Sequence, residues 1–271
     1  MNDADAIIRL QEVHKSFNGE PVLRGVNLAI EAGKTTVIIG PSGCGKSVLL
    51  KHMIALIRPD RGEVFFRNRP IGGLCERQMV DVRRRFGFLF QGGALFDSMT
   101  VQENIVFPLA ENHVSDPERQ KARCREVLSL VGLDGTQQKY PEELSGGQKK
   151  RVALARAIAL GPEVILYDEP TTGLDPIRAD LINELIINLQ KALQTTAVVV
   201  THDMTSACKI ADRIVMLYGG VFIADTTPAG LATIDNETVL RFVQGRASAE
   251  ELEQIRAGRL ARQPFGAPAI P

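Results

Sequence analysis

The residues best suited to chemistry form a glycine-rich octapeptide, Gly40-Pro-Ser-Gly-Cys-Gly-Lys-Ser47, which fits the pattern GxxxxGK[ST]. Glycines let backbone N–H groups turn inward around an anionic phosphate, and the positive end of a following helix adds to the attraction. Lys46 would then reach the β- and γ-phosphates of a nucleotide, and the Ser47 hydroxyl would bind Mg²⁺. A glycine-rich turn that only shapes the chain is the alternative, and the strand-loop-helix context disfavours it. The predicted nucleotide-binding residues are Gly40, Pro41, Ser42, Gly43, Cys44, Gly45, Lys46 and Ser47.

A second chemical feature is the pair of adjacent carboxylates, Asp168 and Glu169, that ends the apolar run Val164-Ile-Leu-Tyr. Buried strands rarely end in two carboxylates unless a cation or a substrate compensates them. We expect Asp168 to hold Mg²⁺ through water and Glu169 to polarise the attacking water as general base. Such a pair alone more often begins a solvated loop, but the phosphate-binding pattern upstream favours the catalytic interpretation.

The segments around these residues alternate between strand-like and helix-like patterns. Such alternation is typical of an α/β fold with a parallel sheet. The predicted strands are 7–13, 26–30, 35–39, 164–168 and 197–201, and 214–217 with 221–224 form a predicted hairpin. Helices are predicted from Lys46, from Gly146 and over 181–193. The helix from Gly146 lies in a stretch from about 92 to 160 that is predicted to be mostly helical.

Composition limits the function classes. A chain of 271 residues suits one large α/β domain with an inserted subdomain and is too short for two nucleotide-binding modules. The 32 Lys and Arg balance the 32 Asp and Glu, so no overall field attracts nucleic acid, and we expect no nucleic-acid partner. No run of about 18 apolar residues occurs, so a membrane role would require a partner. The four scattered cysteines suggest neither a zinc site nor a disulfide framework and fit a reducing cytosol.

A second glycine motif, Leu144-Ser-Gly-Gly-Gln148, stands 20 residues before Asp168. Ser145 and the N–H groups of Gly146 and Gly147 would form an anion cradle at a helix start. With this motif the chain resembles the ATP-binding subunits of ABC transporters over residues 6 to about 230. In that family the cradle, Gln148 included, serves the γ-phosphate held by the opposite subunit. The resemblance therefore implies a head-to-tail dimer of two copies with two ATP molecules at the interface.

The resemblance also assigns roles to four isolated residues. Gln91 matches the glutamine loop that couples the Mg²⁺ site to the helical subdomain, although a lone Gln is ordinarily a polar loop side chain. Asp175 matches the loop that crosses the dimer interface, although an Asp before Pro is ordinarily a helix cap. His202 matches the switch histidine at the γ-phosphate, and Phe17 matches the aromatic that stacks on adenine, where Tyr is more frequent. The implied cofactors are ATP and Mg²⁺, the catalytic set is Lys46, Gln91, Glu169 and His202, and the metal ligands are Ser47, Gln91 and Asp168.

The implied fold is an α/β P-loop NTPase (RecA-like) core with an antiparallel β subdomain and an inserted helical subdomain at about 92–160. We place the ATPase domain at 6–235 and a C-terminal extension at 236–271, which we expect to be an interaction tail. Within the extension, Ser248-Ala-Glu-Glu251 offers a capping box for a helix that carries Leu252, Ile255 and Leu260.

One partner-facing segment bears on the transporter class. Phe90-Gln-Gly-Gly-Ala-Leu-Phe96, followed by 100–109, resembles the ATPases of the Mla and Mce-associated phospholipid transporters of the bacterial envelope. The apolar end of this segment could meet a permease helix or belong to the subdomain core. The resemblance implies permease subunits, with Mce-domain and small accessory proteins as further partners, and a peripheral place at the cytoplasmic face of the inner membrane.

Two alternatives remain open. One is the ATPase of an ABC importer of amino acids or other small solutes. The other is a soluble ABC ATPase of DNA maintenance, which is disfavoured because only about a hundred residues separate the phosphate loop from the signature and no sustained heptads occur.

Overall fold

The computed structural model of the protein describes residues 6–247 and 252–253. The chain divides into two compact units. Unit 1 contains the described residues of Met1–Glu31, Thr36–Gly73 and Val200–Pro271, and unit 2 contains Ala32–Thr35 and Leu74–Val199. The helix predicted from Ser248 onward falls almost entirely outside the described residues.

Unit 1 is built around an antiparallel sheet of order β2-β1-β4-β5. A two-residue turn at Asn18 and Gly19 joins the two long strands, and both residues have positive φ, 51° and 84°. An Asn-Gly pair favours this geometry because the turn's twist matches that of the flanking strands. The strands are β1 (Ala6–Phe17), β2 (Glu20–Glu31), β4 (Arg61–Phe66) and β5 (Arg69–Pro70).

A second strand set in unit 1 carries the phosphate loop. β3 (Thr35–Ile39) is buried along its whole length and pairs in parallel with β9 (Arg213–Tyr218), which pairs antiparallel with β10 (Val221–Thr226). Complete burial on both faces is typical of a central parallel strand. The helices of this unit are α1 (Lys46–Met53), α7 (Met204–Ile210), α8 (Glu237–Gln244) and the 3₁₀ helix η3 (Ala229–Thr233).

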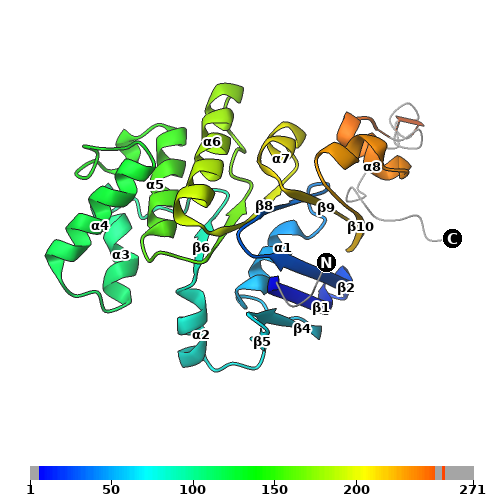
Figure 1. Cartoon of the computed structure of the whole chain (residues 1–271), viewed down its shortest axis with the longest axis horizontal. Helices are drawn as coiled ribbons and strands as arrows, with labels where there is room; N and C mark the ends of the chain where they lie inside the picture. The colour runs from blue at the N-terminus through cyan, green and yellow to red at the C-terminus, as the bar shows by residue number, and fades with distance from the viewer. Residues whose placement is uncertain (1–5, 248–251, 254–271) are drawn as a thin grey trace. The chain divides into compact units, whose positions relative to one another are not determined.

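Unit 2 contains the parallel strands β6 (Phe86–Leu89) and β7 (Val164–Asp168), and β8 (Thr196–Thr201) is next to β7 in the strand order, with residues 196–199 in unit 2. Helices α3 (Val101–Glu111), α4 (Pro117–Leu130) and α5 (Gly146–Ile158) pack against one another (Figure 1). The remaining helices are α2 (Glu76–Arg83), α6 (Pro176–Leu193) and the 3₁₀ helix η2 (Pro141–Glu143).

Side-chain caps set where the helices of unit 2 begin. Thr100 starts α3 with a capping box to Glu103, and Ser145 starts α5 with a capping box to Gln148. These caps satisfy N–H groups that a helix start otherwise leaves unpaired. Among the described helices, none combines the length and apolar character needed to cross a membrane.

Candidate functional site

The phosphate-loop motif connects β3 to α1 in unit 1, as the sequence predicts. Its glycines at 40, 43 and 45 have positive φ values of 152°, 81° and 104°. A Cβ atom at Gly40 would lie 2.2 Å from the Leu217 carbonyl oxygen, and one at Gly45 would lie 2.8 Å from Cγ1 of Val22. The loop conformation therefore requires glycine at positions 40 and 45, for backbone geometry and for space.

Lys46 begins α1 and is buried. Its Nζ donates hydrogen bonds to the carbonyl oxygens of Gly40 at 2.8 Å and Pro41 at 2.9 Å, so the ammonium lies across the loop. The N-cap residue of α1 is Gly45, which supplies no capping side chain, and the first turn has no acidic residue. A helix start of this kind, beside a fixed positive charge, fits a phosphate group.

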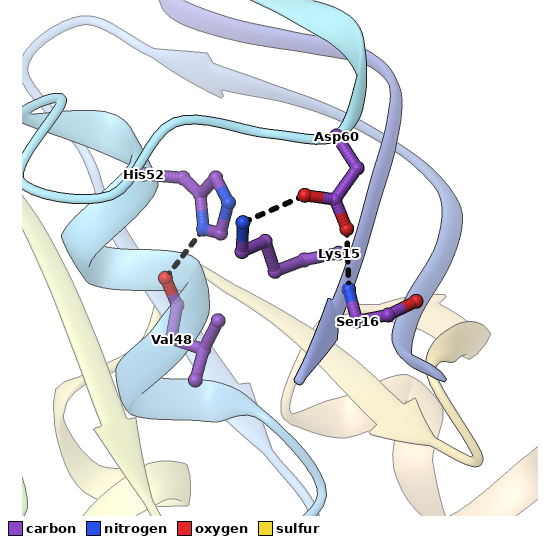
Figure 2. Close-up of polar contacts among 5 residues, drawn as sticks. All are labelled: Lys15, Ser16, Val48, His52 and Asp60. Atoms are coloured by element: carbon purple, nitrogen blue, oxygen red, sulfur yellow. Dashed lines mark hydrogen bonds and ion pairs between the residues drawn. The ribbon is translucent and has the colours of Figure 1, made fainter. Parts of the chain in front are cut away.

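Phe17 is the exposed last residue of β1, and a polar cluster holds the strand end that carries it (Figure 2). The Asp60 carboxylate accepts hydrogen bonds from Lys15 Nζ and from the Ser16 N–H, both at 2.7 Å. The hydrogen bond from Lys15 keeps the pKa of Asp60 below its ordinary value, and Lys15 Nζ lies 5.5 Å from the centre of the Phe17 ring. Sequence reasoning missed Lys15 and Asp60, because 45 residues separate the partners.

His52 lies on α1 beside this cluster and is completely buried (Figure 2). Its Nδ1 is 2.7 Å from the Val48 carbonyl oxygen, to which it donates, while Nε2 has no hydrogen-bond partner within the described part of the chain. Burial lowers the pKa of His52, which favours the neutral form of the ring. A neutral ring keeps a second positive charge away from Lys15.

His202 follows the last residue of β8 and is exposed. Asp203, the next residue, caps α7 by accepting a hydrogen bond from the Thr205 N–H at 3.0 Å. The Asp203 N–H in turn donates to Oγ1 of Thr201 at 3.0 Å. These hydrogen bonds of Thr201 and Asp203, the two neighbours of His202 in the chain, hold the backbone from which the imidazole extends.

In unit 2, Asp168 ends β7 and Glu169 follows it, and both side chains are buried. Glu169 has a φ of 50°, a left-handed conformation that is uncommon for a residue other than glycine. Thr172 Oγ1 donates to Oε2 of Glu169 at 3.1 Å, and the Thr172 N–H donates to the Glu169 carbonyl oxygen at 3.3 Å. The carboxylate thus has a fixed orientation on a strained turn.

Lys150 supports the same turn from helix α5. Its Nζ donates to the carbonyl oxygens of Pro170 at 2.7 Å and Thr172 at 2.6 Å. Burial lowers the pKa of Lys150, and the negative charge of Glu169 opposes that shift. Sequence reasoning missed Lys150 and Thr172, since a lysine three residues past a glycine pair has no distinguishing local pattern.

The signature motif lies at the start of α5. Ser145 is the N-cap, and its Oγ accepts from the Gln148 N–H at 3.3 Å while Gln148 Oε1 accepts from the Ser145 N–H at 2.9 Å. Gly146 and Gly147 are the first helical residues, whose N–H groups have no acceptor inside the helix. A Cβ atom at Gly146 would meet nothing within 4 Å, so this helix start is open and can receive an anion.

Gln91 is exposed on the loop that follows β6. Arg156 of α5 holds this loop, because its Nη2 donates to the Gly93 carbonyl oxygen at 2.9 Å. Burial lowers the pKa of Arg156.

Phe96 and Phe107, which are 41% and 37% exposed, contact each other with ring centres 5.0 Å apart. The predicted partner-facing segment therefore presents an aromatic pair at the surface of unit 2.

Asp175 caps α6, the ordinary role of an Asp before Pro. Its Oδ1 accepts from the Arg178 N–H at 3.0 Å, and Oδ2 lies 3.1 Å from Arg178 Nε. The side chain is exposed, so the cap leaves it accessible at the surface of unit 2.

The predicted site residues divide between the two units. Helix α5 is the common support in unit 2, because it begins with the signature motif and holds the loops of Gln91 and Glu169 through Arg156 and Lys150. Unit 1 holds Phe17, the phosphate loop 40–47 and His202, and unit 2 holds Gln91, the signature residues 145–148, Asp168, Glu169 and Asp175.

The profile of the ABC transporter family matches residues 23–172. A probable ribonucleotide transport ATP-binding protein, mkl of Mycobacterium tuberculosis, is 38% identical over 239 residues, which cover 88% of this chain and 67% of that protein. The intermembrane phospholipid transport system ATP-binding protein MlaF of Haemophilus influenzae is 41% identical over 225 residues, covering 82% of this chain and 84% of that protein.

A solved structure is similar in fold as well as in sequence. The ATP-binding cassette MJ0796, a dimer in a post-hydrolysis state bound to ADP and Pi, is 34% identical and has a TM-score of 0.75, covering 82% of this chain and 98% of that chain. This similarity confirms the predicted α/β fold.

Proposed function

Because this chain belongs to the ABC transporter family, we propose that it is the ATP-binding and ATP-hydrolysing subunit that powers a membrane transporter of phospholipids. The observation that carries the proposal is the phosphate loop, where Lys46 lies across a turn of glycines at an uncapped helix start. The signature helix and the carboxylate pair on the same chain supply the other parts that phosphoryl transfer to water requires.

We assign nucleotide binding to the phosphate loop and Phe17 of unit 1. In the proposed site the loop N–H groups and Lys46 bind the β- and γ-phosphates, and Phe17 stacks on adenine. Ser47, Gln91 and Asp168 would hold Mg²⁺, which neutralises charge on the phosphate oxygens when it is bound. The oxygen donors of these three side chains are the ligand type that Mg²⁺ prefers.

Hydrolysis is assigned to Glu169, which would take a proton from water as the water oxygen attacks the γ-phosphorus and ADP leaves. The Thr172 hydroxyl orients this carboxylate, and His202 would contact the γ-phosphate. Catalysis then depends on positioning and charge neutralisation, with no covalent enzyme intermediate.

A second copy of the chain would complete each site. Ser145, Gly146, Gly147 and Gln148 of one copy would bind the γ-phosphate held by the other, and Asp175 would lie at the interface. The open helix start at Gly146 supports this assignment. So does the similarity to a cassette whose solved structure is a dimer.

The transported substrate class is proposed from the similarity to MlaF and from the segment that resembles lipid-transport ATPases. The exposed pair Phe96 and Phe107 is the proposed contact for a permease helix, since exposed aromatic groups are enriched at protein interfaces. We place the subunit at the cytoplasmic face of the cell membrane, with Mce-domain and small accessory proteins as further partners.

Purification of the tagged protein from its native membranes in mild detergent tests the substrate class. We expect a multi-spanning permease, an Mce-domain protein and phospholipid to co-purify and to be identified by mass spectrometry. The similarity to the methionine import ATP-binding protein MetN 2 of Enterococcus faecalis, 37% identical over 268 residues, favours a second candidate, an importer of amino acids or other small solutes. Recovery of a solute permease with a soluble receptor would overturn the lipid assignment in favour of that candidate.

A further inference from the structure

Lys150 is buried, and the groups that it contacts lie far from it in the sequence. Only 8% of the residue is exposed, and its two hydrogen-bond acceptors are carbonyl oxygens 20 and 22 residues further along the chain. Burying an ammonium is unfavourable unless several acceptors or a negative charge compensate it. Pro170 and Thr172 supply the acceptors, and Glu169 supplies the charge.

The turn that Lys150 holds is strained. Glu169 adopts a φ of 50°, which a residue with a side chain keeps only when its surroundings enforce it. Lys150 donates to the carbonyl groups of Pro170 and Thr172, which follow Glu169 in the chain. Thr172 in turn donates to both the backbone carbonyl and the carboxylate of Glu169. Removal of the ammonium would leave two inward carbonyl oxygens without this donor and would release the turn.

The same helix begins with the signature motif. Ser145 caps α5 and Lys150 lies in its second turn, so one helix carries both the signature motif and the lysine that holds the turn bearing Glu169. The capping box between Ser145 and Gln148 keeps this first turn rigid.

We propose that Lys150 is a positioning residue for ATP hydrolysis: by bridging the carbonyl oxygens of Pro170 and Thr172 it holds the Glu169 carboxylate in place and joins it to the signature helix. The inference rests on the proposed general-base role of Glu169. Lys150 does not touch the reacting atoms and acts only through this turn.

Steady-state ATP hydrolysis by the full-length chain tests the inference. Lys150→Met should lower kcat by about 10²-fold, because a displacement near 1 Å has that effect on a catalytic group. KM and the dissociation constant for ATP should stay near the wild-type values, since the phosphate loop belongs to the other unit. Lys150→Arg, which keeps the charge and its donors, should recover a substantial part of the lost kcat. Lys149→Met is the matched control on the same helix and should hydrolyse ATP like the wild type.

A double variant separates positioning from a general loss of structure. In a Glu169→Gln background, adding Lys150→Met should lower kcat no further if Lys150 acts through Glu169. A further loss comparable to that of the single variant, or a wild-type kcat in Lys150→Met, would overturn the inference. If Glu169→Gln alone turns over like the wild type, the general-base role fails and this inference fails with it. An inactive Glu169→Gln beside a fully active Lys150→Met overturns the positioning role alone.

Discussion

Glu169→Gln removes one negative charge at the end of β7 while keeping the hydrogen bond that the side chain accepts from Thr172. Thr172 Oγ1 donates to Oε2 at 3.1 Å, and the carbonyl oxygen of glutamine accepts the same bond. Glutamine has nearly the volume of glutamate, so a site that is 8% exposed keeps its packing. The change therefore removes the ability of this group to accept a proton, together with the negative charge that it offers to Lys150.

General-base catalysis contributes about 10²- to 10⁴-fold to a rate. We expect kcat to fall by that factor, which raises the activation free energy by about 3–5 kcal/mol. ATP affinity should not fall, because the substitution removes a negative charge that repels the phosphates and leaves the phosphate loop unchanged. The ATP-bound dimer should then accumulate, since the step that separates the two copies is slowed.

Three measurements check this prediction: phosphate release at steady state, equilibrium titration with ATP, and size-exclusion chromatography with ATP present. Glu142→Gln, at an exposed carboxylate of η2, is the matched control and should leave all three unchanged. Wild-type turnover in Glu169→Gln would refute the general-base reasoning. A loss of ATP binding would instead show that the carboxylate serves binding rather than the chemical step.

Four further predictions concern other parts of the chain. Lys46→Ala should weaken ATP binding about ten- to a hundredfold, because hydrogen bonds to a charged group contribute about 1.5–3 kcal/mol, and an unchanged dissociation constant on titration would contradict its role. A bulky thiol reagent should inhibit ATP hydrolysis by modifying the half-buried Cys44, with protection by ATP, whereas inhibition that persists in Cys44→Ala would locate the effect elsewhere. Burial raises the pKa of the Cys124 thiol to about 11 from its ordinary 9.0. The contribution of this thiol to the free energy of unfolding is therefore fully present below pH 9 and is lost as pH rises towards 11, so Cys124→Ala should flatten the fall of Tm over that range. Asp60→Asn should weaken adenine-nucleotide binding by loosening the strand end that carries Phe17; titration with ATP and with triphosphate lacking a base should show the loss for ATP alone.

Several elements were predictable from local pattern alone. β3, β7 and β8 are short runs of mostly apolar, β-branched residues that are buried along their length, and the structure places them within a residue of the predicted bounds. The helix predicted at 181–193 begins earlier, at Pro176, because Asp175 caps it. A cap and a proline at the first helical position are local signals, so this boundary also lay within reach of the sequence.

Other elements were missed or shortened because their patterns are weak. β1 continues to Phe17 and β2 begins at Glu20, beyond the predicted 7–13 and 26–30, because the Asn-Gly turn extends the hairpin through partly exposed residues. β4 and β6 were not predicted, because β4 begins with Arg61, Gly62 and Glu63 instead of an apolar run, and β6 has only four residues, one of them Gly87. Their partners in the sheet stabilise them more than their own sequences do.

The sequence by itself determined the chemistry that the site residues could perform. Types and spacings in the phosphate loop, the signature motif and the carboxylate pair are local properties, and each motif needs only its neighbours to form its turn or helix start. The family assignment followed from the order of these motifs, and comparison with known proteins confirms it.

Only the tertiary structure decided which groups hold those motifs in place. Lys150 meets Pro170 and Thr172 across 20 and 22 residues, and Asp60 meets Lys15 across 45. A lysine or an aspartate carries no sign of its partner, because a long side chain on a helix or loop can pair with any acceptor that folding brings within reach. Which acceptor it meets depends on how helices and strands pack, and packing is a property of the whole chain.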